Sequence, residues 1–102
     1  MKEEYVNLKL IDNATDHRFE MNVDGNIAII EYKRYPGKIA LLHTEVPAQL
    51  EGKGAATAII EKTLAYIENN KPELIPLCPV VVAYIRRHPE WKRLVDDGAA
   101  NI

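Results

Sequence analysis

A glycine-bearing loop, residues 46–56, stands between an apolar run at residues 39–42 and an amphipathic segment that extends to about Asn70. Gly52 and Gly54 carry no Cβ atom, so the loop backbone can come close to a ligand. The first amides of a following helix have no acceptor within the helix and point toward the loop. Such an arrangement forms a nest for a phosphate group. The residue types alone leave a second interpretation open, in which the segment is a strand-to-helix turn that binds no ligand.

The composition is that of one domain spanning residues 1–102. The chain has 102 residues, 47% of them hydrophobic, which is enough to bury roughly two-thirds of its unfolded surface. Its single cysteine, Cys78, excludes an internal disulfide and a cysteine-rich zinc site. We therefore expect a domain that folds without a metal ion.

Charge and hydropathy argue against two classes of partner. The net charge is -2, so the chain as a whole offers no basic surface for nucleic acid. No window approaches the ~18 consecutive apolar residues of a membrane span, and Met1 to Tyr5 are not followed by the apolar run of a signal peptide. We expect a cytoplasmic protein that binds neither nucleic acid nor membranes.

Alternating apolar side chains predict two strands before the loop, joined by a link at residues 12–16. The two patterns are Val6, Leu8 and Leu10, and then Phe19, Met21 and Val23. Asp24-Gly25 predicts a tight hairpin into a third strand at residues 27–30, because both residue types tolerate positive φ. Pro36-Gly37 predicts a second turn, and the run at 39–42 is apolar on both faces, as in a central strand.

Helical periodicity predicts an amphipathic helix from the loop to about Asn70, which Pro72 ends. Residues 74–78 predict a fifth strand, in which Pro76 cannot donate to a ladder and therefore indicates an edge, a bulge or an opened sheet. Residues 79–88 fit a strand by their valines or a helix by Pro79 in a first turn, and we favour the helix. A last helical turn is expected at residues 91–95, and a frayed tail from residue 98.

The predicted order is β-β-β-β-α-β-α, an α+β fold with an antiparallel meander and a helical crossover to a parallel fifth strand. Two nucleotide motifs do not fit the loop. The run Gly52-Lys53-Gly54-Ala55-Ala56-Thr57 lacks the third glycine of the dinucleotide fingerprint, and no Gly-Lys-Ser/Thr closes a Walker loop.

The loop residues Gln49-Leu50-Glu51-Gly52-Lys53-Gly54 resemble the Q/R-x-x-G-x-G/A loop of the GNAT superfamily of acyl-CoA-dependent N-acyltransferases. The flanking segments strengthen the resemblance: His43-Thr44-Glu45-Val46-Pro47 before the loop, and Leu77-Cys78-Pro79, Tyr84-Ile85, His88-Pro89-Glu90-Trp91 and Leu94-Val95 after it. Over nearly the whole chain the set is similar to a small single-domain GNAT-like N-acetyltransferase family, the YjdJ-like group.

This resemblance implies a minimal GNAT-like fold in which strands four and five are parallel and splay apart, with acetyl-CoA between them. Pro76 fits such a fold, because a missing N–H costs little where the ladder is already open. The loop amides would hold the pyrophosphate, and the strand before the loop would pair with the pantetheine amides. The implied acetyl-CoA (CoA) binding residues are Thr44, Glu45, Val46, Gln49, Leu50, Glu51, Gly52, Lys53, Gly54, Ala55, Ala56 and Cys78.

Glu51 departs from the family pattern, because many GNAT loops carry a basic or neutral residue just before the glycine. A carboxylate at that place repels a pyrophosphate unless it points to solvent. Lys53 would offset this repulsion.

Cys78 is the sharpest candidate for chemistry. It lies where the fifth strand ends and Pro79 opens a helix, so unpaired amides and the helix dipole would favour its thiolate. A thiolate there could attack acetyl-CoA to give an acetyl-enzyme, or form a mixed disulfide with CoA. The alternative is a buried cysteine that acts as a small apolar core residue.

Two further catalytic candidates also have structural alternatives. His43 could be the general base for an amine, because histidine titrates near neutral pH, or it could be a structural hydrogen-bonding group. By the resemblance, Tyr84 could donate a proton to the leaving CoA thiolate, or it could pack in the core. Glu31 and Glu45 are weaker candidates for a base.

The sequence supports three functions. The first is an acetyl-CoA-dependent N-acetyltransferase that acts on an unidentified amine, as a monomer or a weak homodimer; the second is a non-catalytic CoA-binding module; the third is a ligand-free interaction domain. Typical GNAT enzymes carry helices between the first two strands, so by the resemblance the short link here implies an acceptor groove that is open or completed by a partner chain. An open groove suits an extended acceptor such as a protein amine or a polyamine. A basic cluster could meet a CoA phosphate or an acidic acceptor, although a solvated surface is the simpler interpretation: Arg86, Arg87, His88, Lys92 and Arg93.

Overall fold

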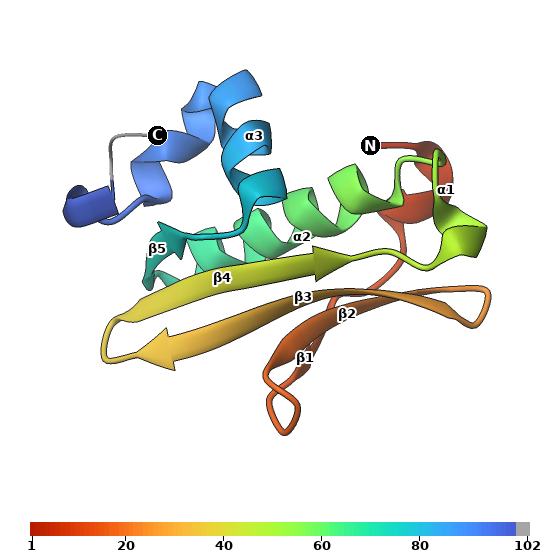
Figure 1. Cartoon of the computed structure of the whole chain (residues 1–102), viewed down its shortest axis with the longest axis horizontal. Helices are drawn as coiled ribbons and strands as arrows, with labels where there is room; N and C mark the ends of the chain where they lie inside the picture. Colours follow the sequence, from red (N-terminus) through yellow and green to blue (C-terminus); the bar gives the residue numbers. More distant parts are fainter. Residues whose placement is uncertain (100–102) are drawn as a thin grey trace.

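The computed structural model of the chain describes residues 1–99. Its elements, labelled in Figure 1, are α1 (Glu3–Val6), β1 (Ile11–Asn13), β2 (Arg18–Val23), β3 (Asn26–Tyr35), β4 (Lys38–Glu45), the 3-10 turn η1 (Ala48–Leu50), α2 (Ala55–Asn70), β5 (Glu73–Pro76), α3 (Pro79–Arg87), and the 3-10 turns η2 (Pro89–Leu94) and η3 (Asp97–Ala99). Within residues 1–99, no helix has the length and apolar character needed to cross a membrane.

The sheet has the order β1-β2-β3-β4-β5, with the first four strands antiparallel and β5 parallel to β4. Both predicted turns are confirmed. Asp24 and Gly25 have φ values of 53° and 88° between β2 and β3, and Gly37 has a φ of 71° between β3 and β4. These positive φ values let two residues reverse the chain, so the meander is encoded locally.

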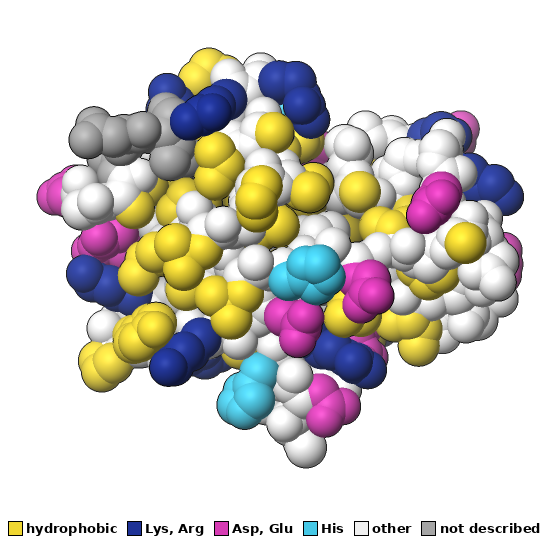
Figure 2. Space-filling model, viewed as in Figure 1, with side chains coloured by type: hydrophobic (Ala, Val, Ile, Leu, Met, Phe, Trp, Pro, Cys, Tyr) yellow, Lys and Arg dark blue, Asp and Glu magenta, His cyan; other side chains and the backbone are white. Residues whose placement is uncertain are grey.

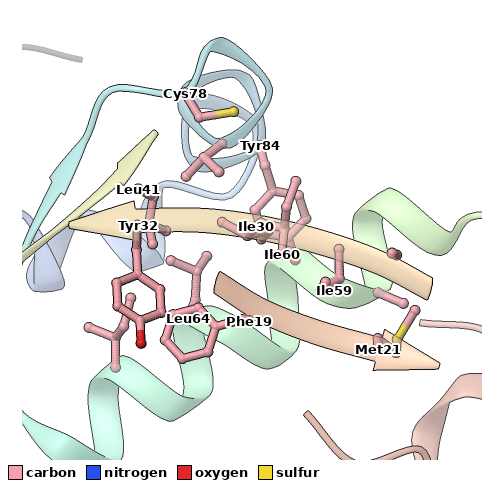
Figure 3. Packing of buried hydrophobic residues seen from close by; sticks show 14 of the residues in the cluster. Phe19, Met21, Ile30, Tyr32, Leu41, Ile59, Ile60, Leu64, Cys78 and Tyr84 are labelled. Atoms are coloured by element: carbon pink, nitrogen blue, oxygen red, sulfur yellow. The ribbon is translucent and has the colours of Figure 1, made fainter. Parts of the chain in front are cut away.

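Helix α2 crosses one face of the sheet between β4 and β5, as the periodicity predicts (Figure 1). Its apolar stripe packs against inward-facing strand residues in a single core. Figure 3 shows this packing for Phe19, Met21, Ile30, Ile59, Ile60 and Leu64, all of which are buried. Burial of such a side chain contributes about 1.5–3 kcal/mol, so the helix is fixed firmly against the sheet.

Helix α3 resolves the ambiguity at residues 79–88 in favour of a helix. Val81, Tyr84 and Ile85 are its buried residues, and they join the same core as α2. The helix ends at Arg87 because His88, which precedes Pro89, leaves the helical conformation, with φ of -129° and ψ of 70°. The turn η2 then packs back on the core, as expected for residues 91–95.

The predicted first strand at Val6, Leu8 and Leu10 is wrong. Residues 3–6 form the short helix α1, and the strand that pairs with β2 begins only at Ile11. The alternation misleads because Tyr5 is the buried residue of this segment, at 1% exposure, whereas Val6 is 56% exposed. A tertiary contact of Tyr5 therefore overrides the local pattern, and the link between β1 and β2 is the turn at residues 14–17.

The end of the chain is partly described. The expected frayed tail begins at Gly98, yet Gly98 and Ala99 belong to η3, and the Ala99 amide donates to the Asp96 carbonyl at 2.8 Å. The rest of that expectation, for residues 100–102, lies outside the described residues.

Candidate functional site

The sheet opens between β4 and β5. Their parallel pairing runs from Lys38 and Glu73 to Leu41 and Pro76 and ends there. The Leu41 carbonyl accepts hydrogen bonds from the amides of Leu77 at 3.0 Å and Cys78 at 2.9 Å, which turns the chain away from β4. Among the described residues, 1–99, no strand pairs with residues 42–45 of β4 on the β5 side. The splay predicted for strands four and five is present, and Pro76 occupies the last paired position.

A β-bulge coincides with this opening. Glu31 pairs with His43 and the next residue, Tyr32, pairs with Leu41, so Leu42 is an extra residue on β4. A bulge bends its strand and raises the local twist. The bend of β4 at Leu42 and the departure of β5 after Pro76 thus occur side by side and widen the opening together.

Cys78 stands at the inner end of this opening. It is the N-cap residue of α3, as predicted, and it is 1% exposed. Its sulfur makes no capping hydrogen bond to the helix amides; instead Cys78 Sγ lies 3.4 Å from Thr44 Oγ1 on the unpaired part of β4. The contact joins the two sides of the opening, and either atom can be the donor.

The glycine loop lies beyond the end of β4. Gly52 and Gly54 have φ values of 73° and 80°, a conformation that favours glycine, and Gly54 is the N-cap residue of α2. Within residues 1–99, five amides of this loop and of the first turn of α2 donate to no carbonyl or side chain: Gly52, Gly54, Ala55, Ala56 and Thr57. Free amides at the positive end of a 16-residue helix are a ready site for an anion.

A hollow of about 200 Å³ lies along these amides. Its lining residues are Val46, Leu50, Glu51, Gly52, Gly54, Ala55, Ala56 and Thr57. All but Thr57 belong to the predicted binding set, whereas Gln49 and Lys53 of that set are exposed loop residues outside the lining. Thr57 also lines the hollow, although the predicted set omits it; its place in the first helical turn is the signal that could have indicated it.

The other face of β4 carries the candidate bases. Thr44 pairs with the buried Ile30 and contacts Cys78, so its neighbours in the strand, His43 and Glu45, point to the opposite, open face of the sheet. His43 lies across from Glu31 there. Figure 2 shows histidine, acidic and basic side chains gathered over β3 and β4 on this face. His43 and Cys78 are therefore on opposite faces of one strand.

A hollow of about 390 Å³ opens on that face at the end of β4. Arg18, Ile27, Ile29 and Glu45 line it together with residues 46–48. Arg18 forms an ion pair with Glu20 at 2.8 Å, and this hydrogen bond lowers the pKa of Glu20. The hollow thus combines an apolar floor, a paired cation and the carboxylate of Glu45.

A family model described as GCN5-related N-acetyl-transferase matches residues 18–94. The chain belongs to this N-acetyltransferase family. The match begins at β2 and ends with η2, so it covers the opening, the glycine loop and Cys78. Members of the GCN5-related family generally use acetyl-CoA, and the domain is of the acyltransferase type. No curated protein matches the chain.

The hydroxyl of Tyr84 points to α2 and not to an open substrate site. It is 4% exposed, and its hydroxyl donates to Glu61 Oε2 on α2 at 3.3 Å. Burial, followed by the neighbouring Glu61 carboxylate, raises the pKa of Tyr84 and makes it a weaker acid. Of the two interpretations for Tyr84, these contacts favour packing over proton donation.

The basic cluster beyond α3 is exposed and partly engaged elsewhere. Arg93 pairs with Glu68 on α2, and its guanidinium lies 5.0 Å from the centroid of the Trp91 ring. These contacts fasten η2 to α2. They favour the interpretation of a solvated surface for this cluster in a GCN5-related domain.

One contact of the glycine loop escaped sequence reasoning. The Tyr5 hydroxyl donates to the Lys53 carbonyl at 2.9 Å, across 48 residues of sequence. Tyr5 lies just before the segment assigned wrongly to a strand, and no local pattern links it to the loop. Only the burial of an aromatic residue with a polar end could have suggested a distant partner.

Proposed function

We propose that the protein transfers the acetyl group of acetyl-CoA to an amine. The observation that carries the proposal is the end of the β4–β5 pairing at Leu41 and Pro76. It leaves one open strand edge between the free amides of the glycine loop and the Thr44–Cys78 contact. An extended thioester with a pyrophosphate at its far end fits this order of features.

The backbone would carry most of the recognition. The loop amides at Gly52, Gly54, Ala55 and Ala56 would bind the pyrophosphate oxygens, and the unpaired edge at residues 42–45 would bind the pantetheine amides as a strand binds its neighbour. Glu51 is exposed, so its carboxylate can turn to solvent and leave the pyrophosphate to the amides.

Cys78 would accept the acetyl group first. In this step Cys78 Sγ forms a bond to the acetyl carbon, the thioester C–S bond breaks, and the proton from Cys78 passes to the departing CoA sulfur. In the second step the amine nitrogen bonds to the acetyl carbon, the bond to Cys78 Sγ breaks, and the amine proton restores the thiol. Thr44 Oγ1, 3.4 Å from the sulfur, would donate to the thiolate form in both steps.

The amine would approach from the open face. An amine at neutral pH is mainly protonated and must lose a proton before it can attack. His43 would accept this proton, and Glu45 would attract the ammonium group beside it. Both side chains are exposed on the face opposite to Cys78, so the deprotonated amine would pass through the gap beyond the end of the β4–β5 pairing to reach the acetyl carbon on Cys78 Sγ.

A second function is favoured by one observation. Cys78 is only 1% exposed, so a thioester reaches its sulfur only after a local movement around α3. Without that movement the protein would bind acetyl-CoA and not react with it. The second candidate function is therefore that of a module that binds CoA without catalysing acetyl transfer.

Two measurements on the unmodified chain test the proposal. Acetyl-CoA at about 100 times its Kd stabilises a protein by about 2.7 kcal/mol, which we expect as a rise in melting temperature. A panel of peptide amines and polyamines should then yield acetylated product and free CoA. Binding without any product supports the module, and the absence of saturable binding rejects both functions.

A further inference from the structure

The short helix α1 lies against the glycine loop, outside the residues that the family model matches. Tyr5 is 1% exposed and joins the hydrophobic core, while its hydroxyl donates to the Lys53 carbonyl at 2.9 Å. A second bond holds the segment from the other side, because Lys62 Nζ on α2 donates to the Val6 carbonyl at 3.2 Å. The segment is thus fixed to both the loop and the helix that follows it.

The hydrogen bond from Tyr5 acts on one particular peptide group. The Lys53 carbonyl and the Gly54 amide belong to the same planar unit, and in a trans peptide the C=O and N–H bonds point in opposite directions. When Tyr5 holds the carbonyl on the α1 side, the Gly54 N–H is directed to the other side. Gly54 lines the hollow of about 200 Å³ beside the free amides.

The side chain of Lys2 lies against Gly54 of the same loop. Its Cγ, Cδ and Cε atoms lie 3.9, 3.8 and 3.6 Å from the position that a Cβ atom of Gly54 would occupy. The side chain therefore runs along the loop, and its ammonium stands one bond beyond the nearest of these atoms. Within residues 1–99, Lys2 forms no ion pair, whereas Glu51 places a carboxylate on the loop.

We propose that Lys2 and Tyr5 complete the phosphate site: Tyr5 is a positioning residue that orients the Lys53–Gly54 peptide, and Lys2 supplies a cation to the pyrophosphate. This inference rests on the proposed function, because it assigns the loop to the phosphates of CoA. It explains how a loop that contains Glu51 can bind a pyrophosphate. A GCN5-related domain that began at β2 would lack both contributions.

The test compares CoA with pantetheine, which has the same thiol arm and no phosphate groups. Tyr5→Phe keeps the buried ring and removes the hydroxyl, and we expect it to raise the Kd of CoA about two- to tenfold. Lys2→Met keeps the packed carbons and removes the charge, with an expected rise of about two- to fivefold that vanishes at high salt. Neither change should alter the Kd of pantetheine. Lys2→Arg keeps the positive charge and should bind CoA with the Kd of the unmodified protein.

Matched controls show whether the loss of any exposed tyrosine hydroxyl or lysine charge changes CoA binding. Tyr35→Phe removes the hydroxyl of an exposed tyrosine, and Lys9→Met removes an exposed charge of the same chain segment. Both should bind CoA like the unmodified protein. Lys2 is exposed, so its variant keeps the test valid even if Tyr5→Phe unfolds.

The outcomes are distinct. If the unmodified protein binds no CoA, the proposed function fails and this inference fails with it. If the unmodified protein binds CoA and both variants bind it equally well, the inference is overturned and the proposed function stands. An equal loss of CoA and pantetheine binding also overturns it, because the residues would then act through the fold alone.

Discussion

Gly54→Val tests the assignment of the loop as a phosphate site. A Cβ at Gly54 would lie 3.6 Å from Lys2 Cε, which is an ordinary contact, so space is not the obstacle. The obstacle is the backbone conformation, because Gly54 has a φ of +80° and a residue with a β-branched side chain rarely adopts that value. Holding valine there costs of order 1–3 kcal/mol, and the strain is relieved if the Lys53–Gly54 peptide rotates.

Rotation of this peptide would turn its amide away from the phosphate. A hydrogen bond to a charged group contributes about 1.5–3 kcal/mol, so the loss of one donor should raise the Kd of acetyl-CoA roughly 10- to 150-fold. Isothermal titration calorimetry measures this change directly. Thermal unfolding without ligand should show a fall of about 4–8 °C for each kcal/mol of residual strain.

Gly37→Val is the matched control. Gly37 has a φ of +71° with no atom within 4 Å of its Cβ position, and it lies in the β3–β4 turn rather than in the loop. The control should lose a similar amount of stability and bind acetyl-CoA normally. An unchanged affinity in Gly54→Val, or an equal loss of affinity in both variants, would refute the assignment of the loop amides to the phosphates.

Three further predictions concern single side chains. Tyr84→Phe should lower the free energy of unfolding by about 0.5–1.5 kcal/mol through the lost bond to Glu61 and leave kcat within twofold; a drop in kcat of a hundredfold or more would restore Tyr84 as a proton donor. Arg18 lowers the pKa of Glu20 below its ordinary value of 4.5, so their pair stabilises the fold above pH 4.5 and this stability is lost as the pH falls through the lowered pKa. Arg18→Gln should therefore reduce the melting temperature at neutral pH and converge with the unmodified protein in acid; parallel curves would contradict the assignment. Cys78→Ala should bind acetyl-CoA normally but give no acetylated protein by intact mass and no amine product, whereas full activity would make Cys78 a core residue.

The sequence predicts the meander and the crossover because their determinants are local. Asp24-Gly25 and Pro36-Gly37 fix two turns through the φ values that these residues allow, and the stripe along α2 fixes the face that it buries. Helix α3 follows for the same reason, since Pro79 opens it and His88 before Pro89 ends it. Each of these signals acts within a few residues.

The parts that sequence reasoning missed depend on distant contacts. Tyr5 contacts Lys53 across 48 residues in a short helix, and the alternating residues that follow form no strand before Ile11. The bulge at Leu42 likewise depends on the register between β3 and β4, which no local pattern specifies. The partner of Cys78 is also distant, because Thr44 reaches its sulfur only when β5 leaves β4.

In the candidate site, too, the backbone conformation could be predicted from local sequence, whereas the side-chain contacts could not. The backbone conformation of the glycine loop could be predicted because the positive φ values at Gly52 and Gly54 are ones that glycine adopts readily. The side-chain candidates were predicted by type and not by place. Tyr84 is turned toward Glu61, and His43 lies on the opposite face of β4 from Cys78.

Backbone NMR of the isotope-labelled chain during a titration with acetyl-CoA tests the central claim most directly. The account predicts saturable shifts of the amides of Thr44 on the open part of β4 and of Gly52, Gly54 and Ala55 in the loop that follows it, with the amide of Gly37 unchanged. Shifts confined to other parts of the sheet, or no shifts at millimolar acetyl-CoA, would contradict it.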